Sequence, residues 1–209
     1  MKKIESWLII MVLLIVIITS GCKRKDTSSD TETPIKPTTI HEAAEQDDKA
    51  YIEKFLVQGI DINLKDQFGN TPLHCACLEG KEAVVEFLVR NGANINAINF
   101  DRRSPIYCAI CNGYKEIVEI LVANGANINT MDNRRLTPLH TSVMFGQPDI
   151  LKLLLSNGAD MSAKDNDGKT PLDRAIILSE TKFRRGTEFE KRKQAFQECV
   201  QILRENEGK

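Results

Sequence analysis

The sequence predicts an all-α solenoid of helix–turn–helix repeats, because three markers recur at one constant interval. The first is the motif TPLH at 71–74, which returns unchanged at 137, with substitutions at 104 and 170, and as a degenerate copy at 38. The second is a glycine at 59, 92, 125 and 158, and the third a glycine at 80, 113 and 146. Every step is 33 residues. Three markers in one register predict about five stacked repeats.

Each marker has a defined place in a pair of helices. The motif's threonine can cap the first helix, and its proline fits the first turn, where a missing N–H costs nothing. The two glycine series would end the first and second helices, because both ends favour a left-handed residue. Matching slots of the second helices predict one buried apolar stripe per repeat. These slots hold Ile52, Val85, Val118 and Leu151, and three residues later Phe55, Leu88, Leu121 and Leu154.

The motif and its spacing resemble the ankyrin-repeat family over roughly residues 38–178. The resemblance implies an all-α ankyrin-repeat solenoid, in which β-hairpin-like fingers join the helix pairs and neighbouring repeats supply the core. We expect this domain to occupy residues 38–207, with repeats starting at 38, 71, 104, 137 and 170. Both ends depart from the pattern, as caps should. Asp47 replaces a glycine in the first repeat, and the last repeat ends in a long helix from about Thr187 to Asn206.

The first 21 residues predict a secretory signal peptide. Two lysines precede an apolar run from Trp7 to Ile18, and small residues then lead to Cys22. The run is short of the ~20 residues that span a bilayer. The ending ITSGC at 18–22 resembles the lipobox of bacterial lipoproteins, which implies that Cys22 is acylated and becomes the first residue. An uncleaved signal anchor, flanked by KRK at 23–25, is the alternative.

Residues 22–37 are polar and rich in Ser, Thr and Pro, which predicts a lipid-anchored flexible linker. Both interpretations of the N-terminus place the rest of the chain outside the cytoplasm. We therefore expect a cell-envelope protein that is lipid-anchored to a bacterial membrane, with its domain facing the periplasm or the exterior.

The residue content argues against catalysis. The three histidines, His41, His74 and His140, all occupy the fourth slot of the repeat motif. The family resemblance implies that they make structural hydrogen bonds there, which leaves no histidine for a triad or a metal. A net charge of −1 gives no reason to expect a nucleic-acid ligand. We expect no enzyme activity, no metal and no cofactor.

Two cysteine pairs, Cys75 with Cys77 and Cys108 with Cys111, superficially have zinc-site spacings. Both pairs fall on predicted first helices, where residues two apart point to nearly opposite sides. We favour the interpretation that these cysteines, like Cys199, pack as small hydrophobes. A disulfide or redox role is the alternative, and it predicts an exposed thiol of lowered pKa.

The binding prediction rests on variable positions at the finger tips and on the exposed side of the first helices, where the resemblance implies that partners bind. These positions are apolar with arginines at the rim, as in protein-binding patches. Arg102 and Arg135 replace tip glycines found at Gly69 and Gly168. The alternative is that neighbouring side chains cover some of them. The predicted partner-binding residues are Phe68, Leu78, Phe100, Arg102, Arg103, Arg134, Arg135, Leu136, Met144 and Phe145.

We therefore expect a monomeric, membrane-tethered module that binds a protein partner bringing an apolar anchor and an acidic rim. By analogy with other bacterial lipoproteins, immunity-like neutralisation of a toxin is one form of this function. An oxidative-stress or redox-linked envelope protein is the alternative function.

Substitution of Cys22 tests the lipid anchor. Cys22→Ser should abolish the acyl chains and block removal of residues 1–21, because the thiol is the site of acylation. Mass spectrometry of the native protein should show acyl groups on an N-terminal Cys22. An intact Met1 terminus without acyl groups would contradict the lipoprotein prediction.

Overall fold

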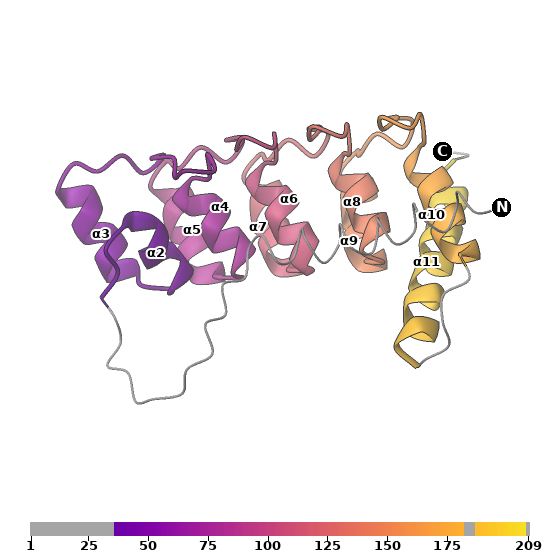
Figure 1. Ribbon diagram of the computed structural model, residues 1–209, viewed down its shortest axis with the longest axis horizontal. Coiled ribbons are helices and arrows are strands. Elements are labelled where there is room, and N and C mark those ends of the chain that lie inside the picture. The colour runs from indigo at the N-terminus through magenta and orange to yellow at the C-terminus, as the bar shows by residue number, and fades with distance from the viewer. Residues whose placement is uncertain (1–35, 182–186, 208–209) are drawn as a thin grey trace. The chain divides into compact units, whose positions relative to one another are not determined.

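The computed structural model describes residues 36–181 and 187–207, and the repeat-bearing compact unit begins at Pro37. These residues form ten α-helices, α2 to α11, and no strand. The helices stand in pairs along a row, with connecting loops at one edge (Figure 1). The predicted all-α solenoid is therefore confirmed.

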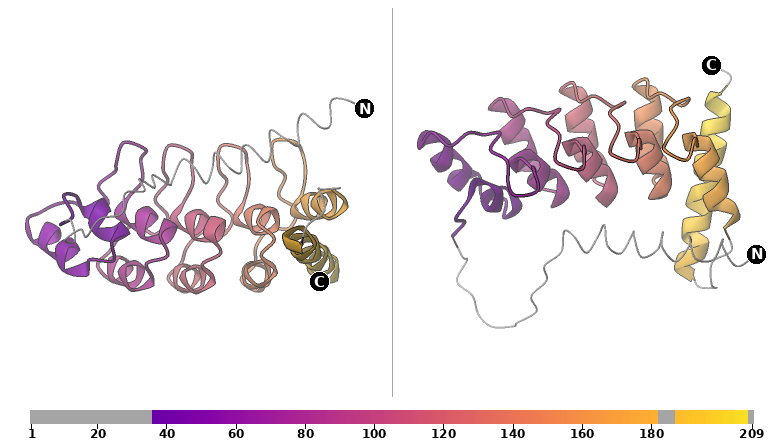
Figure 2. Two further views of the ribbon diagram at one scale, coloured as in Figure 1. Left: turned by 60° about the horizontal axis from the view of Figure 1, so that its bottom comes forward. Right: turned by 45° about the horizontal axis from the view of Figure 1, so that its top comes forward.

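Every repeat contributes two helices in two layers. Figure 2 shows the loops, the first helices and the second helices at three successive levels. The first helices are α2 (Ile40–Glu45), α4 (Pro72–Leu78), α6 (Pro105–Asn112), α8 (Pro138–Met144) and α10 (Pro171–Glu180). The second helices are α3 (Lys49–Val57), α5 (Glu82–Arg90), α7 (Lys115–Ala123), α9 (Pro148–Ser156) and α11 (Thr187–Asn206). The expected bounds of the final helix agree with α11.

The predicted apolar stripe forms the core. Ile52, Val85, Val118 and Leu151 are all 0% exposed, and three residues later Leu88, Leu121 and Leu154 are too. Phe55, in the same slot of the first repeat, is only half-buried. The difference follows from stacking, because no described repeat covers that side of α3. At the other end α11 buries Phe196, Cys199 and Leu203, whereas Val200 is half-buried.

Close contacts between repeats depend on the first-helix glycines. Gly80 follows α4 with φ +70°, and a Cβ there would lie 2.6 Å from the ring of Tyr114 in the next repeat. Asp47 takes the same left-handed conformation in the first repeat, with φ 62°. The glycine at 80 therefore serves both the backbone turn and the distance between repeats.

Polar bonds join the loops from one repeat to the next. The side-chain oxygen of Asn63 accepts from the N–H of Asn94 at 2.7 Å, and Asn96 accepts from the N–H of Asn127 at 2.8 Å. Nearer the tips, the N–H of Phe100 donates to the carbonyl of Phe68 at 3.1 Å. The fingers are therefore turns joined by one backbone hydrogen bond between neighbours, with side-chain bonds added, rather than paired strands.

The described residues include no helix with the length and apolar character needed to cross a bilayer. The predicted signal peptide, Cys22 and most of the linker lie outside the described residues.

Two glycine substitutions separate backbone strain from contact between repeats. Gly80→Ala should lower the free energy of unfolding by about 2–4 kcal/mol, because it adds a clash with Tyr114 to the cost of a left-handed alanine. Gly92→Ala is the matched control, since φ is +85° and nothing lies within 4 Å of the added Cβ. It should lose only about 1 kcal/mol. Urea unfolding measures both, and equal losses would contradict the proposed contact.

Candidate protein-binding surface

The four fingers are residues 64–70, 97–103, 130–136 and 163–169, numbered 1 to 4 along the chain. They share one turn, organised by one acidic or amide side chain each. Oδ1 of Asp66 accepts from the N–H groups of Phe68 and Asn70, both at 2.8 Å. Asn99, Asp132 and Asp165 make the equivalent pair of bonds in the other three fingers. This repeated geometry fixes the fingers' backbones and makes their tip positions directly comparable.

The tip position is left-handed in all four fingers, yet only two of them use glycine. Gly69 and Gly168 have φ +79° and +69°, whereas Arg102 and Arg135 both have φ 59°. This conformation costs a residue with a Cβ about 1–2 kcal/mol. The two middle fingers therefore carry arginine despite a local preference for glycine.

The four predicted arginines are not equivalent. The guanidinium of Arg103 lies 4.9 Å from the ring centroid of Tyr107 and pairs with Asp101 at 3.3 Å. Arg134 pairs with Asp132 at 3.6 Å. Arg102 and Arg135, by contrast, are exposed, and no carboxylate in the described part of the chain pairs with either. The predicted cluster of four thus presents two uncompensated charges.

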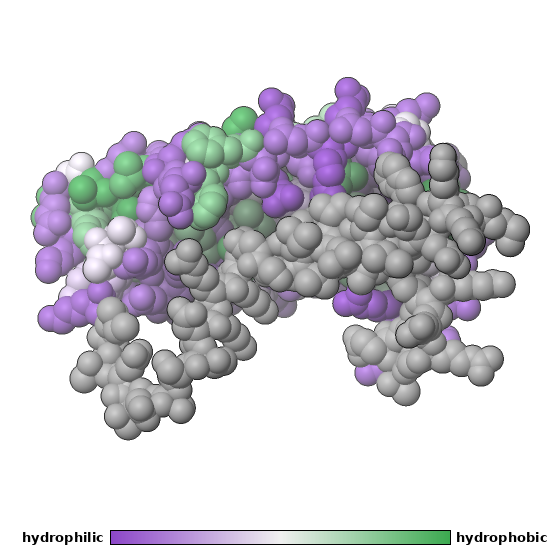
Figure 3. Space-filling view, in the orientation of Figure 1, coloured by the Kyte–Doolittle hydropathy of each residue, from purple (hydrophilic) through white to green (hydrophobic). Residues whose placement is uncertain are grey.

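Exposed apolar side chains gather on the first two fingers. Phe68 is 58% exposed and Phe100 69%, and Leu64 and Ile98 add to the same fingers at 45% and 40%. Figure 3 shows apolar side chains at the left end of the row and along its upper edge near α4. Leu64 and Ile98 were not among the predicted residues. The sequence did contain a signal for them, because finger 4 has Ala163 at the slot of Leu64 and Lys164 at the slot of Ile98.

Leu136 was predicted to be a partner-binding residue, but the structure buries its side chain. It is only 4% exposed, so a partner cannot reach its side chain. Its N–H donates to Oδ1 of Asp132 at 2.9 Å in the closing arm of the finger, where burial of an apolar side chain is favourable. Leu136 is therefore a packing residue and not part of the candidate surface.

The first-helix residues are half-buried rather than open. Leu78 packs against the core cluster, and Met144 and Phe145 are of intermediate exposure. Phe145 also caps α8, since its N–H donates to the carbonyl of Thr141 at 3.1 Å. Ile177, the α10 residue at the slot of Met144, is 45% exposed. Neighbours therefore cover part of this face, and the fingers carry its most exposed residues.

The histidines connect the first helices that carry them, α2, α4 and α8, to a finger. Nδ1 of His74 accepts from the N–H of Thr71 at 3.1 Å, so Nε2 carries the proton and donates to the carbonyl of Arg103 at 3.0 Å. His140 makes the equivalent bonds to Thr137 and Lys169. Burial lowers the pKa of His74 to about 4 and also lowers the pKa of His140. The structural role expected for them is confirmed.

Three of the described thiols, those of Cys75, Cys77 and Cys199, lack the lowered pKa of a redox group. Burial raises the pKa of Cys75 and Cys77 well above the usual range and raises that of Cys199 to about 12. A reactive thiol needs a lowered pKa. Cys108 is buried and Cys111 half-buried. Among the described residues, no three His, Cys, Asp or Glu side chains come together as a metal site.

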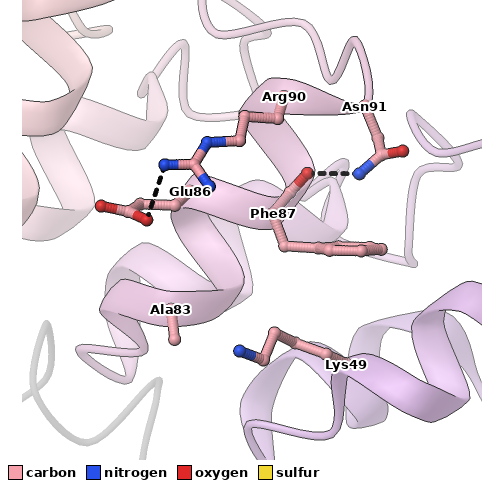
Figure 4. A pocket seen from close by; sticks show the side chains of 6 residues that line it. All are labelled: Lys49, Ala83, Glu86, Phe87, Arg90 and Asn91. Carbon is pink, nitrogen blue, oxygen red and sulfur yellow. Dashed lines mark hydrogen bonds and ion pairs between the residues drawn. The ribbon is translucent and has the colours of Figure 1, made fainter.

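A hollow of about 160 Å³ lies between α3 and α5, away from the fingers (Figure 4). The Arg90–Glu86 pair, at 3.2 Å, forms one side of it, and Phe87 and Lys49 lie across from this pair. It contains none of the predicted binding residues. The candidate surface is accordingly an exposed face rather than a cavity.

The fold and this face define a repeat scaffold that displays side chains on rigid loops. A family model described as ankyrin repeats (3 copies) matches residues 40–132. A second model, described as ankyrin repeats (many copies), matches residues 121–175. The chain belongs to the ankyrin-repeat family. Ankyrin repeats generally mediate protein–protein interaction and are typically non-enzymatic. A search of curated proteins finds no significant match to the chain.

The pKa of His74 predicts a pH-dependent stability. Between the unfolded value of 6.5 and the folded value of about 4, the unfolded chain binds the proton more readily, so stability falls as the pH falls. The loss in free energy of unfolding that His74 causes should reach about 3 kcal/mol near pH 4, relative to neutral pH. His74→Asn should remove it, because asparagine does not titrate and can accept from Thr71 N–H as Asp173 accepts from Thr170. Unfolding of both proteins at pH 7, 5.5 and 4 measures the difference. Parallel pH profiles would contradict the assignment.

Proposed function

We propose that the chain is an extracytoplasmic, lipid-tethered module that holds a protein partner on its finger face. We define the finger face as the tips of the four fingers, residues 67–69, 100–102, 133–135 and 166–168. The observation that carries the proposal is the exposure of Phe68, Phe100, Arg102 and Arg135 on adjacent fingers. Aromatic and arginine side chains are the most frequent energetic centres of protein interfaces.

The geometry of the fingers favours binding by preorganisation. Each tip is fixed by two bonds to one side chain, and neighbouring tips are joined by a backbone bond such as that from Phe100 to Phe68. A partner would therefore meet side chains on a backbone that is already ordered. Less ordering on binding leaves more of the contact energy as affinity.

The lipid tether and the envelope location rest on the signal and the lipobox-like ending at Cys22. Two or three acyl chains would anchor the module stably, whereas one chain binds a membrane only marginally. Immunity-like neutralisation of a toxin is the specific case in which the captured protein is a toxin. The raised pKa values of Cys75, Cys77 and Cys199 disfavour the redox alternative.

Site-specific photocrosslinking in intact cells tests the proposed face. A crosslinker at Asn133, an exposed tip residue of the third finger, should capture a discrete protein. The same group at Glu116, exposed on α7 of the second-helix layer, is the control and should capture none. Capture from Glu116 but not from Asn133 would place the partner on the second-helix layer and contradict the proposed face.

Phe100→Ala is the companion variant in this experiment. It should weaken capture at Asn133 at least tenfold, as expected for an interface centre worth about 2 kcal/mol. The melting temperature should change little, because the side chain is 69% exposed. Undiminished capture would remove Phe100 from the binding face.

A further inference from the structure

We propose that Arg102 and Arg135 are a pair of carboxylate receptors, and that their ligand is an extended acidic segment of the partner protein whose apolar residues lie on Phe68 and Phe100. This inference rests on the proposed function. It adds the chemistry of the partner segment and the direction in which it runs along the fingers.

Backbone strain marks these two arginines. All four tips have the same turn and the same sign of φ, so glycine suits each of them equally. At Gly168 nothing lies within 4 Å of an added Cβ, yet that tip is still glycine, which shows what the turn prefers where space is open. Arginine at 102 and 135 opposes this preference. Strained residues of this kind cluster at binding sites, where the side chain has a use that offsets its cost.

The guanidinium groups of Arg102 and Arg135 are also available to bind an anion. Arg103 and Arg134, one residue away on the same fingers, are occupied by Asp101 and Asp132. Arg102 and Arg135 are exposed and unpaired with any described carboxylate. Nε of Arg135 donates to the carbonyl of Lys164 at 3.3 Å, which leaves the N–H groups of its two terminal nitrogens for a ligand. A guanidinium binds a carboxylate through two parallel bonds.

The order of side chains along the fingers gives the ligand a direction. Finger 1 carries Phe68, finger 2 carries Phe100 and Arg102, and finger 3 carries Arg135. Equivalent positions of stacked repeats are about 10 Å apart, the distance between packed helices. An extended chain covers this distance in about three residues. The ligand therefore has apolar residues over fingers 1 and 2, followed by two acidic residues about three positions apart.

A protein segment fits this surface better than an anionic membrane. Acidic side chains alternate with the basic ones on fingers 2 and 3, where Asp101 pairs with Arg103 and Asp132 with Arg134. These fingers therefore lack the uninterrupted cluster of Lys and Arg residues that recruits an anionic bilayer. A peptide can place apolar residues on Phe68 and Phe100 and keep its carboxylates at Arg102 and Arg135.

Selection from a display library of random 12-residue peptides tests the proposal on the full chain in detergent. The native protein should enrich peptides with two Asp or Glu residues about three apart beside an apolar cluster. Arg102→Gly/Arg135→Gly should bind the enriched peptides at least tenfold more weakly. The same variant should melt about 2–4 °C higher, because the strain relieved at both tips outweighs the extra conformational freedom that two glycines give the unfolded chain. Arg102→Lys/Arg135→Lys keeps the charge and should bind with intermediate affinity, without the gain in melting temperature.

Arg192→Ala/Arg204→Ala is the matched control. It removes two exposed arginines from α11 with the same change in net charge, and should bind the peptides as the native protein does. Equal binding by the glycine variant, no enrichment of acidic residues, or no gain in melting temperature would each overturn the inference. Binding to phosphatidylglycerol vesicles that depends on the two arginines would also overturn it, in favour of a membrane surface. Photocapture at Asn133 that persists in the glycine variant would reject this inference alone, whereas failure of capture in the native protein would reject the proposed function.

Discussion

The apolar stripe of each helix pair can be buried only against the next repeat, and this constraint determines the rest of the structure. Residues such as Val85, Val118 and Leu151 reach 0% exposure because a neighbouring pair lies on either side of each. Stacking at one constant spacing then requires that the contacts between repeats recur. The close approach of Tyr114 to Gly80 and the bond from His74 to the carbonyl of Arg103 are such contacts.

The same stacking holds the finger backbones in one conformation but leaves the identity of the tip side chains open to variation. Once the helices are in place, the finger backbones have no freedom left, since Asp66 and its counterparts close each turn. The side chains at the tips contribute little to the core, so their identity can differ between fingers. The row therefore presents a phenylalanine-bearing stretch followed by an arginine-bearing stretch on a single backbone pattern.

Residue types that often perform catalysis have structural uses in this protein. His74 and His140 hold protons on Nε2 to bond finger carbonyls, and their lowered pKa values keep these two rings neutral near pH 7. Acidic side chains close the turns or neutralise arginines, as Asp132 does for Arg134. These uses tie the histidines and the turn-closing acidic residues to the structure of the repeats.

The sequence by itself determined the helices, their register, the buried stripe and the bounds of α11, because these follow from local caps and from one repeating period. It also showed that Arg102 and Arg135 replace a tip glycine, and the structure added that both arginines are left-handed. Only the tertiary structure decided which of the variable side chains are available. Leu136 turned out to be buried, Arg103 to lie over Tyr107, and Phe145 to be half covered. The physical reason is that exposure at a finger depends on contacts across the turn and between repeats, and a repeating period carries no information about those contacts.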